Sequence, residues 1–86
     1  MRLDKYLQVS RLIRRRTLAK TVIEDGRVAV NGRPAKPSTA VAVGDRIALD
    51  LPKGALVVEV LAVREHVAAR DAASLYRIVS QESGSA

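Results

Sequence analysis

The sequence predicts an α+β fold, in which two N-terminal helices pack on a small, mostly antiparallel β-sheet. Three observations predict this fold. Apolar residues near the N-terminus follow helical spacing, Asn31-Gly32 separates two alternating segments, and alternation of apolar residues then continues to Val79. The chain has 86 residues, of which 25 are Val, Leu or Ile, so we expect one domain with a packed core.

The first helix is predicted near residues 3–9. Its apolar residues recur at i, i+3 and i+4, as on one face of a helix: Leu3, Tyr6 and Leu7. The second helix is predicted over about 15–25, with an apolar stripe of Leu18, Val22 and Ile23. Thr17 is its expected N-cap, and Gly26 is suited to end it because glycine tolerates the left-handed conformation. We expect the helices to pack through Leu3, Leu7, Leu18 and Val22.

A β-hairpin is predicted directly after the second helix. Residues 27–30 alternate as a strand, and Asn31-Gly32 suits a type I′ turn because both residues accept positive φ. The returning strand, 33–35, contains Pro34, which confines it to a sheet edge because proline has no amide donor.

Three further strands are predicted, at 46–51, 55–63 and 75–79. A charged, Ala-rich loop or single helical turn is expected over 64–74. The expected boundaries are a single domain over 1–80, with a motif core at 1–50 and a β extension at 51–80, and a flexible tail over 81–86.

The positive charge is concentrated in one part of the chain. Residues 1–36 hold ten Lys and Arg against three acidic residues, a net charge of +7, whereas 37–86 carries −1. A basic segment of this kind favours a polyanionic partner such as nucleic acid. No apolar run approaches the ~20 residues that span a membrane, and no signal-peptide pattern is present, so we expect a cytoplasmic protein without a membrane partner.

Few residues in the chain are suited to catalysis. Cysteine is absent, which excludes thiolate nucleophiles, disulfides and Cys-ligated zinc. His66 is the only histidine and is expected to be simply exposed, and Asp45 and Asp50 lack the partners that acid–base chemistry requires. We therefore expect a protein that is not an enzyme and that uses no cofactor or metal.

Three consecutive arginines, 14–16, lie at the expected start of the second helix. Cations are disfavoured at this end of a helix, so their presence suggests an external anion. Arginine also suits bidentate phosphate recognition. The predicted RNA-binding residues are the cations around the two helices and the hairpin: Arg2, Lys5, Arg11, Arg14, Arg15, Arg16, Lys20, Arg33 and Lys36. Asp4 is expected to pair with a neighbouring arginine and to fix its side chain.

The only aromatic residues are Tyr6 and Tyr76, and both fit core positions. Modules that stack the bases of single strands need several such platforms. We therefore predict recognition of folded RNA through its backbone and shape.

Four segments resemble the RNA-binding domain named after small-subunit ribosomal protein S-four, also called the alpha-L motif. They are Arg2-Leu3-Asp4-Lys5-Tyr6-Leu7, Ser10-Arg11-Leu12, Arg16-Thr17-Leu18-Ala19, and Gly26-Arg27-Val28-Ala29-Val30-Asn31-Gly32. With no catalytic domain attached, the chain resembles the fifteen-kilodalton heat-shock protein family, and most closely its short bacterial RqcP branch.

This resemblance implies a role in bacterial ribosome-associated quality control. Such proteins bind rRNA and tRNA on stalled large ribosomal subunits that hold peptidyl-tRNA. They support an NFACT-family factor that adds alanine to the nascent chain. Arg2 and Arg16 match family positions expected to contact RNA backbone. We expect a monomer away from the ribosome.

Two alternatives remain open on the sequence. One is a heat-shock-type recycling factor that moves peptidyl-tRNA on free large subunits. The other is a helix-turn-helix DNA-binding regulator, which is disfavoured because a hairpin follows the second helix at once.

Overall fold

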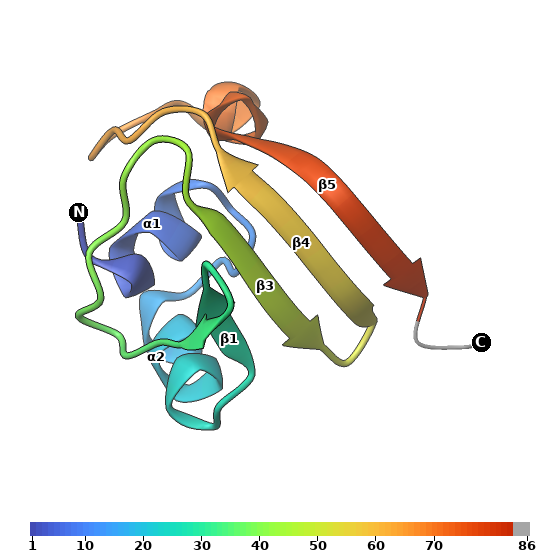
Figure 1. The fold of residues 1–86 in the computed structure, drawn as a ribbon. Helices are drawn as coiled ribbons and strands as arrows, with labels where there is room; N and C mark the ends of the chain where they lie inside the picture. Colours follow the sequence, from blue (N-terminus) through green and yellow to red (C-terminus); the bar gives the residue numbers. More distant parts are fainter. Residues whose placement is uncertain (84–86) are drawn as a thin grey trace.

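A computed structural model describes residues 1–83 and contains a five-stranded antiparallel sheet with helices on one side (Figure 1). The elements are α1 (Leu3–Val9), α2 (Arg16–Glu24), β1 (Val28–Val30), β2 (Arg33–Pro34), β3 (Arg46–Leu51), β4 (Gly54–Val60), the 3₁₀ helix η1 (Ala69–Leu75) and β5 (Tyr76–Ser83). The strand order is β2-β1-β3-β4-β5. The predicted α+β fold is confirmed.

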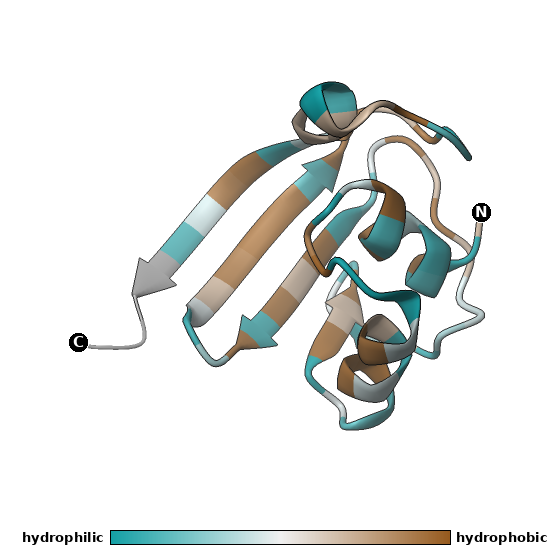
Figure 2. Ribbon diagram, turned by 180° about the vertical axis from the view of Figure 1, so that it is seen from behind, coloured by the Kyte–Doolittle hydropathy of each residue, from teal (hydrophilic) through white to brown (hydrophobic). Residues whose placement is uncertain are grey.

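The two N-terminal helices lie at the β1 end of the sheet, and β5 lies at the opposite edge (Figures 1 and 2). The core sits between helices and sheet and includes Tyr6, Leu7, Ile23, Ile47 and Val58, all at most 1% exposed. None of the helices in the described part of the chain is long and apolar enough to cross a membrane.

The hairpin forms as predicted. Asn31 and Gly32 have φ of +53° and +80°, as a type I′ turn requires. Asn31 also accepts a hydrogen bond from the Arg46 amide at 2.9 Å and donates to Asp45 at 3.1 Å. Asp45 therefore has a structural role, and Pro34 lies in the edge strand β2.

Two expectations about α2 are wrong. The N-cap is Arg15, which makes no side-chain capping bond, and Thr17 lies inside the helix. Leu18 is 52% exposed instead of packing against α1. The buried face carries Ala19 and Ile23, four residues apart, and Leu18 lies one helical step of 100° away from Ala19.

The last strand is longer than predicted. It runs to Ser83, because the start of β4 offers pairing partners to its end, with Gly54 opposite Ser83. Residues 81–83 of the tail expected over 81–86 therefore belong to β5, and 84–86 lie outside the described residues. β4 ends at Val60, three residues earlier than predicted. The subdivision at residue 50 stays a prediction.

Candidate nucleic-acid interface

The N-terminus of α1 is closed by a loop from much later in the chain. The Leu3 amide donates to the Thr39 carbonyl at 2.8 Å, and the Asp4 amide donates to the Pro37 carbonyl at 3.2 Å. These bonds satisfy amides that have no partner within the helix. They also place the loop that contains Pro37 beside Arg2.

Asp4 is the centre of the site, and its side chain is only 3% exposed. Arg2 donates to it twice, from Nε to Oδ1 at 3.2 Å and from Nη2 to Oδ2 at 3.1 Å. Arg16 donates from Nη2 to Oδ1 at 3.5 Å, and the Lys5 amide donates to the same oxygen at 2.7 Å. One buried carboxylate therefore orients two arginines from different segments, as expected for Asp4.

The Asp4 carboxylate is ionised at neutral pH. Burial alone would raise its pKa, but the hydrogen bonds from Arg2 and the Lys5 amide and the charge of Arg16 together hold that pKa below its usual range. The guanidinium-bearing side chains of Arg2 and Arg16 remain 51% and 45% exposed. An arginine has five N–H donors, and Asp4 uses two from Arg2 and one from Arg16, so several remain for an anion.

The connection between the helices fixes where Arg16 emerges. Ile13 is buried, and its amide donates to the Leu7 carbonyl at 3.1 Å. Arg11 adopts a φ of +63°, which reverses the chain after α1. Arg15 is extended and Arg16 begins α2, so the three arginines lie at the helix start as predicted.

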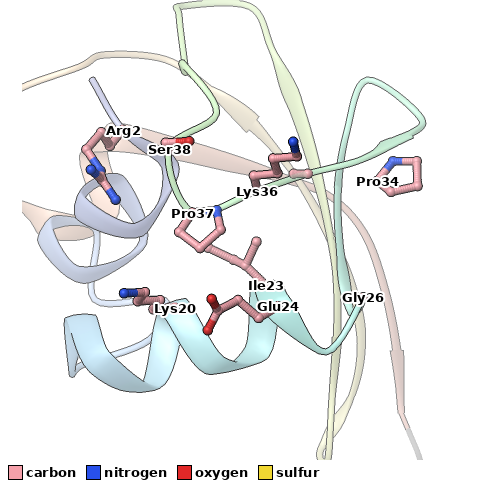
Figure 3. Close-up of a pocket in the computed structure, with 10 residues that line it drawn as sticks. Arg2, Lys20, Ile23, Glu24, Gly26, Pro34, Lys36, Pro37 and Ser38 are labelled. Carbon is pink, nitrogen blue, oxygen red and sulfur yellow. The ribbon is translucent and has the colours of Figure 1, made fainter.

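Two adjoining depressions lie beside these arginines. The smaller, of about 290 Å³, is lined by Arg2, Asp4, Arg16, Thr17 and Lys20. The larger, of about 560 Å³, lies between α2 and residues 34–38 and shares Arg2 and Lys20 with the first (Figure 3). Lys36 lies on its far wall. We call the surface formed by Arg2, Arg16, Lys20 and Lys36 the cationic face.

The other predicted cations lie elsewhere. Lys5 and Arg11 line a separate depression of about 170 Å³, together with Glu65 and His66. Arg14 and Arg15 are exposed just before α2, and Arg33 is exposed on β2. The structure thus brings four of the nine predicted residues onto one face, and their contact with RNA stays a prediction.

Several residues of the larger depression were not predicted from the sequence, among them Ile23, Glu24, Pro37 and Ser38. No local pattern marks them, because they meet only after the 37–39 loop has paired with the start of α1. Among residues 1–83, no group of three or more His, Cys, Asp or Glu is arranged to hold a metal ion.

The S4 domain model matches residues 1–47, more than half of the chain. This chain belongs to the S4 domain family. The match covers both helices, the hairpin, the 36–39 loop and the start of β3, and hence every residue of the cationic face. The resemblance stated from the sequence is confirmed.

Relatives of this S4 domain protein extend the comparison beyond residue 47. A protein of Halalkalibacterium halodurans named RQC P-site tRNA stabilizing factor is 48% identical over 82 residues, which are 95% of this chain and 93% of the relative. A Streptococcus pneumoniae protein of the same name is 47% identical, over 94% of this chain and 92% of the relative.

The trimeric structure of Vibrio cholerae Heat Shock Protein 15 has the same fold. It superposes with a TM-score of 0.86 at 33% identity, over 93% of this chain and 82% of that one. The similarity therefore includes the C-terminal strands β4 and β5 as well as the S4 domain.

Proposed function

We propose that this chain is a non-catalytic RNA-binding protein of bacterial ribosome-associated quality control. It binds rRNA and tRNA on large ribosomal subunits that carry peptidyl-tRNA, and it supports C-terminal alanine tailing of the stalled nascent chain. The protein acts in the cytoplasm and holds the tRNA in place without performing peptide-bond chemistry.

The observation that carries the proposal is the pair of arginines fixed by Asp4. Arg2 and Arg16 present free N–H donors from a rigid scaffold, and Lys20 lines the same depression. Preorganised guanidinium groups match the spacing of phosphate oxygens and lose little side-chain entropy on binding. This surface suits the phosphate backbone of folded RNA.

The names of the relatives support the assignment to a P-site tRNA. The partners we propose are large-subunit rRNA, peptidyl-tRNA and an NFACT-family tailing factor, as the resemblance stated from the sequence implies. We further propose that the free protein is a monomer, although the Vibrio cholerae structure is described as trimeric. Light scattering on the purified chain tests this.

A second candidate is a recycling factor that moves peptidyl-tRNA on free large subunits without tailing. The similarity to Heat Shock Protein 15 favours it. A helix-turn-helix regulator is less well supported, because α2 leads directly into the β1–β2 hairpin and not into a recognition helix.

Purification of ribosomal complexes on a tagged copy of the chain tests the proposal. We expect large subunits with tRNA and an NFACT-type factor. Large subunits with tRNA but without that factor would support the recycling role. Recovery of mature ribosomes or of DNA would contradict both.

A matched pair of variants tests the cationic face. Arg16→Ala is expected to abolish cosedimentation with large subunits, whereas Arg70→Ala, which removes an 87% exposed arginine on η1, is expected to leave it unchanged. If about five cations meet phosphates, raising salt from about 50 to 200 mM lowers RNA affinity by roughly two decades. Equal behaviour of the two variants, or a flat salt response, would contradict this site.

A further inference from the structure

The larger depression of the cationic face differs from a simple phosphate-binding groove. It is lined by three cations, Arg2, Lys20 and Lys36, but also by the accessible apolar side chains of Pro34, Ala35 and Pro37, next to the core residue Ile23, which is only 1% exposed. In Figure 3 Ile23 and the Pro37 ring lie close together between α2 and the 36–38 segment. A phosphate gains no binding energy from an apolar wall. The flat, poorly hydrated face of a nucleobase does gain binding energy there, because its contact with apolar side chains removes both surfaces from water. The volume of about 560 Å³ is within the range of about 300–1,000 Å³ that small-ligand sites occupy.

Glu24 adds an acceptor to this groove. Its side chain is exposed, projects from the end of α2 toward the groove, and makes no ion pair within residues 1–83 (Figure 3). A negative charge at the last residue of a helix is disfavoured by the helix dipole. Glu24 also weakens the attraction of this basic segment for a polyanion. Lys20, one helical turn earlier and in the same groove, partly offsets these two disadvantages. It forms no ion pair with Glu24, so both carboxylate oxygens remain available to a specific donor.

We propose that this groove accepts the base of one unpaired guanine nucleotide of the bound RNA. The inference rests on the proposed function and adds base recognition to it. The guanine N1–H and N2–H groups donate to the two carboxylate oxygens of Glu24. The base face packs on Pro37, and the adjoining phosphates bind Arg2 and Lys20, which line both depressions.

The preference for guanine follows from the pattern of donors on each base. A carboxylate offers only acceptors, so it pairs best with two adjacent donors. Guanine presents two donors side by side on its Watson–Crick edge. Adenine and cytosine each present one amino donor beside a ring nitrogen that accepts, and uracil presents one N–H between two carbonyl oxygens. These acceptors repel the second carboxylate oxygen.

Four RNA hairpins that differ only in one bulged nucleotide, G, A, C or U, test the proposal. We expect wild-type protein to bind the hairpin with bulged G about tenfold more tightly than the other three, as for a good bidentate base contact. Glu24→Gln replaces one acceptor with a donor and is expected to abolish this preference. Glu65→Gln removes an equal charge outside the groove and is expected to retain it.

A purely electrostatic effect of Glu24 gives a different result. Loss of one negative charge would then tighten binding to all four hairpins by the same factor. That outcome, or equal wild-type affinity for the four hairpins, would overturn the base site while leaving the proposed RNA-binding function intact. Absence of binding to every RNA would overturn both.

Guanosine monophosphate locates the site independently of any folded RNA. In amide NMR spectra of the wild-type chain, we expect the signals of Glu24, Gly26 and Ser38 to shift on addition of guanosine monophosphate. The same shifts should need higher concentrations of adenosine, cytidine or uridine monophosphate. Shifts confined to the smaller depression, at Arg16 and Thr17, would indicate phosphate binding only and would overturn the proposal.

Discussion

The residues of α1 and its flanks contribute to two cationic depressions, and only one of them contains a buried carboxylate. Arg2 and Arg16 donate hydrogen bonds to the Asp4 carboxylate, which is almost fully buried. The Asp4 amide in turn donates to the Pro37 carbonyl of the 37–39 loop. Their guanidinium groups are therefore held in one orientation before any ligand arrives. An anion that binds them costs little further ordering.

Lys5 and Arg11 line the second depression, where no buried carboxylate holds their side chains in one orientation. Among the side chains of residues 1–81, none forms an ion pair with Lys5 or Arg11, and Glu65 lies in the same depression. Each long side chain must give up its rotamer freedom to bind an anion, and a nearby carboxylate opposes the contact. Equal charge does not imply equal binding, and the difference between the two depressions is open to direct measurement.

The largest difference is expected between two double variants that each remove two positive charges. Arg2→Ala with Arg16→Ala is expected to weaken tRNA binding by about 100-fold or more, because two charge-assisted hydrogen-bonding groups are lost. Lys5→Ala with Arg11→Ala is expected to cost less than about fivefold. Fluorescence anisotropy with labelled tRNA at one fixed salt concentration measures both.

This comparison separates orientation from charge. If net charge alone controlled binding, the two double variants would lose the same affinity and show the same salt slope. Equal losses would therefore contradict the role assigned to Asp4.

The next largest effect is expected at Asp4 itself. Asp4→Asn raises the net charge by one, yet we expect it to weaken tRNA binding by about tenfold, because Arg2 and Arg16 lose their common anchor and repel each other. Asp50→Asn makes the same charge change at an exposed position of β3 and is expected to leave binding unchanged or slightly tighter. If Asp4→Asn also tightens binding, preorganisation is not the cause.

Local sequence patterns predicted the fold well. Period-3.6 and period-2 spacing and the Asn31-Gly32 turn are local signals, and they located both helices and all five strands. Leu18 was misplaced because several faces of a short helix carry apolar residues, and only tertiary packing selects the face with Ala19 and Ile23. β5 was predicted too short because its end is polar, and its pairing with β4 is a backbone interaction.

The candidate site was predicted only in part. The pairing of Asp4 with an arginine was expected, and the resemblance selected Arg2 and Arg16. The sequence contained no sign that Lys5 and Lys20 belong to different depressions, or that Pro37 lies beside Arg2. The second placement depends on hydrogen bonds between α1 and a loop more than thirty residues away.

A smaller effect is expected where α1 is joined to the C-terminal part of the core. The Tyr6 hydroxyl donates to the Leu75 carbonyl at 2.7 Å in a buried position, joining α1 to the end of η1. Tyr6→Phe removes this bond, while the carbonyl still accepts from the Leu61 and Ala62 amides at 2.9 and 3.2 Å. It is therefore expected to lower the free energy of unfolding by about 1 kcal/mol, the net value of one hydrogen bond. Tyr76→Phe, at a half-buried tyrosine, is the control and is expected to change it by less than about 0.5 kcal/mol.

Urea unfolding measures the stability of both tyrosine variants, and tRNA affinity tests whether this contact affects the cationic face. Tyr6→Phe is expected to leave that affinity unchanged, because the hydrogen bonds that orient Arg2 and Arg16 do not involve Tyr6 or Leu75. A loss of affinity as large as that of Asp4→Asn would show that the cationic face also depends on the C-terminal strands.

The smallest effect is the dependence of stability on pH. The pKa of Asp4 is lower in the folded protein than in the unfolded chain, where it is about 3.9. Its stabilising contribution is therefore complete at pH values above the unfolded pKa and is lost as pH falls through the folded pKa.

The difference in unfolding free energy between wild type and Asp4→Asn is expected to stay constant from pH 7 to about 5 and to shrink below about pH 4. Because all other carboxylates are common to both proteins, their titration cancels from this difference. A difference that stays constant or grows in acid would mean that Arg2 and Arg16 do not stabilise the Asp4 carboxylate in the folded state, and that the two depressions do not differ in the way proposed here.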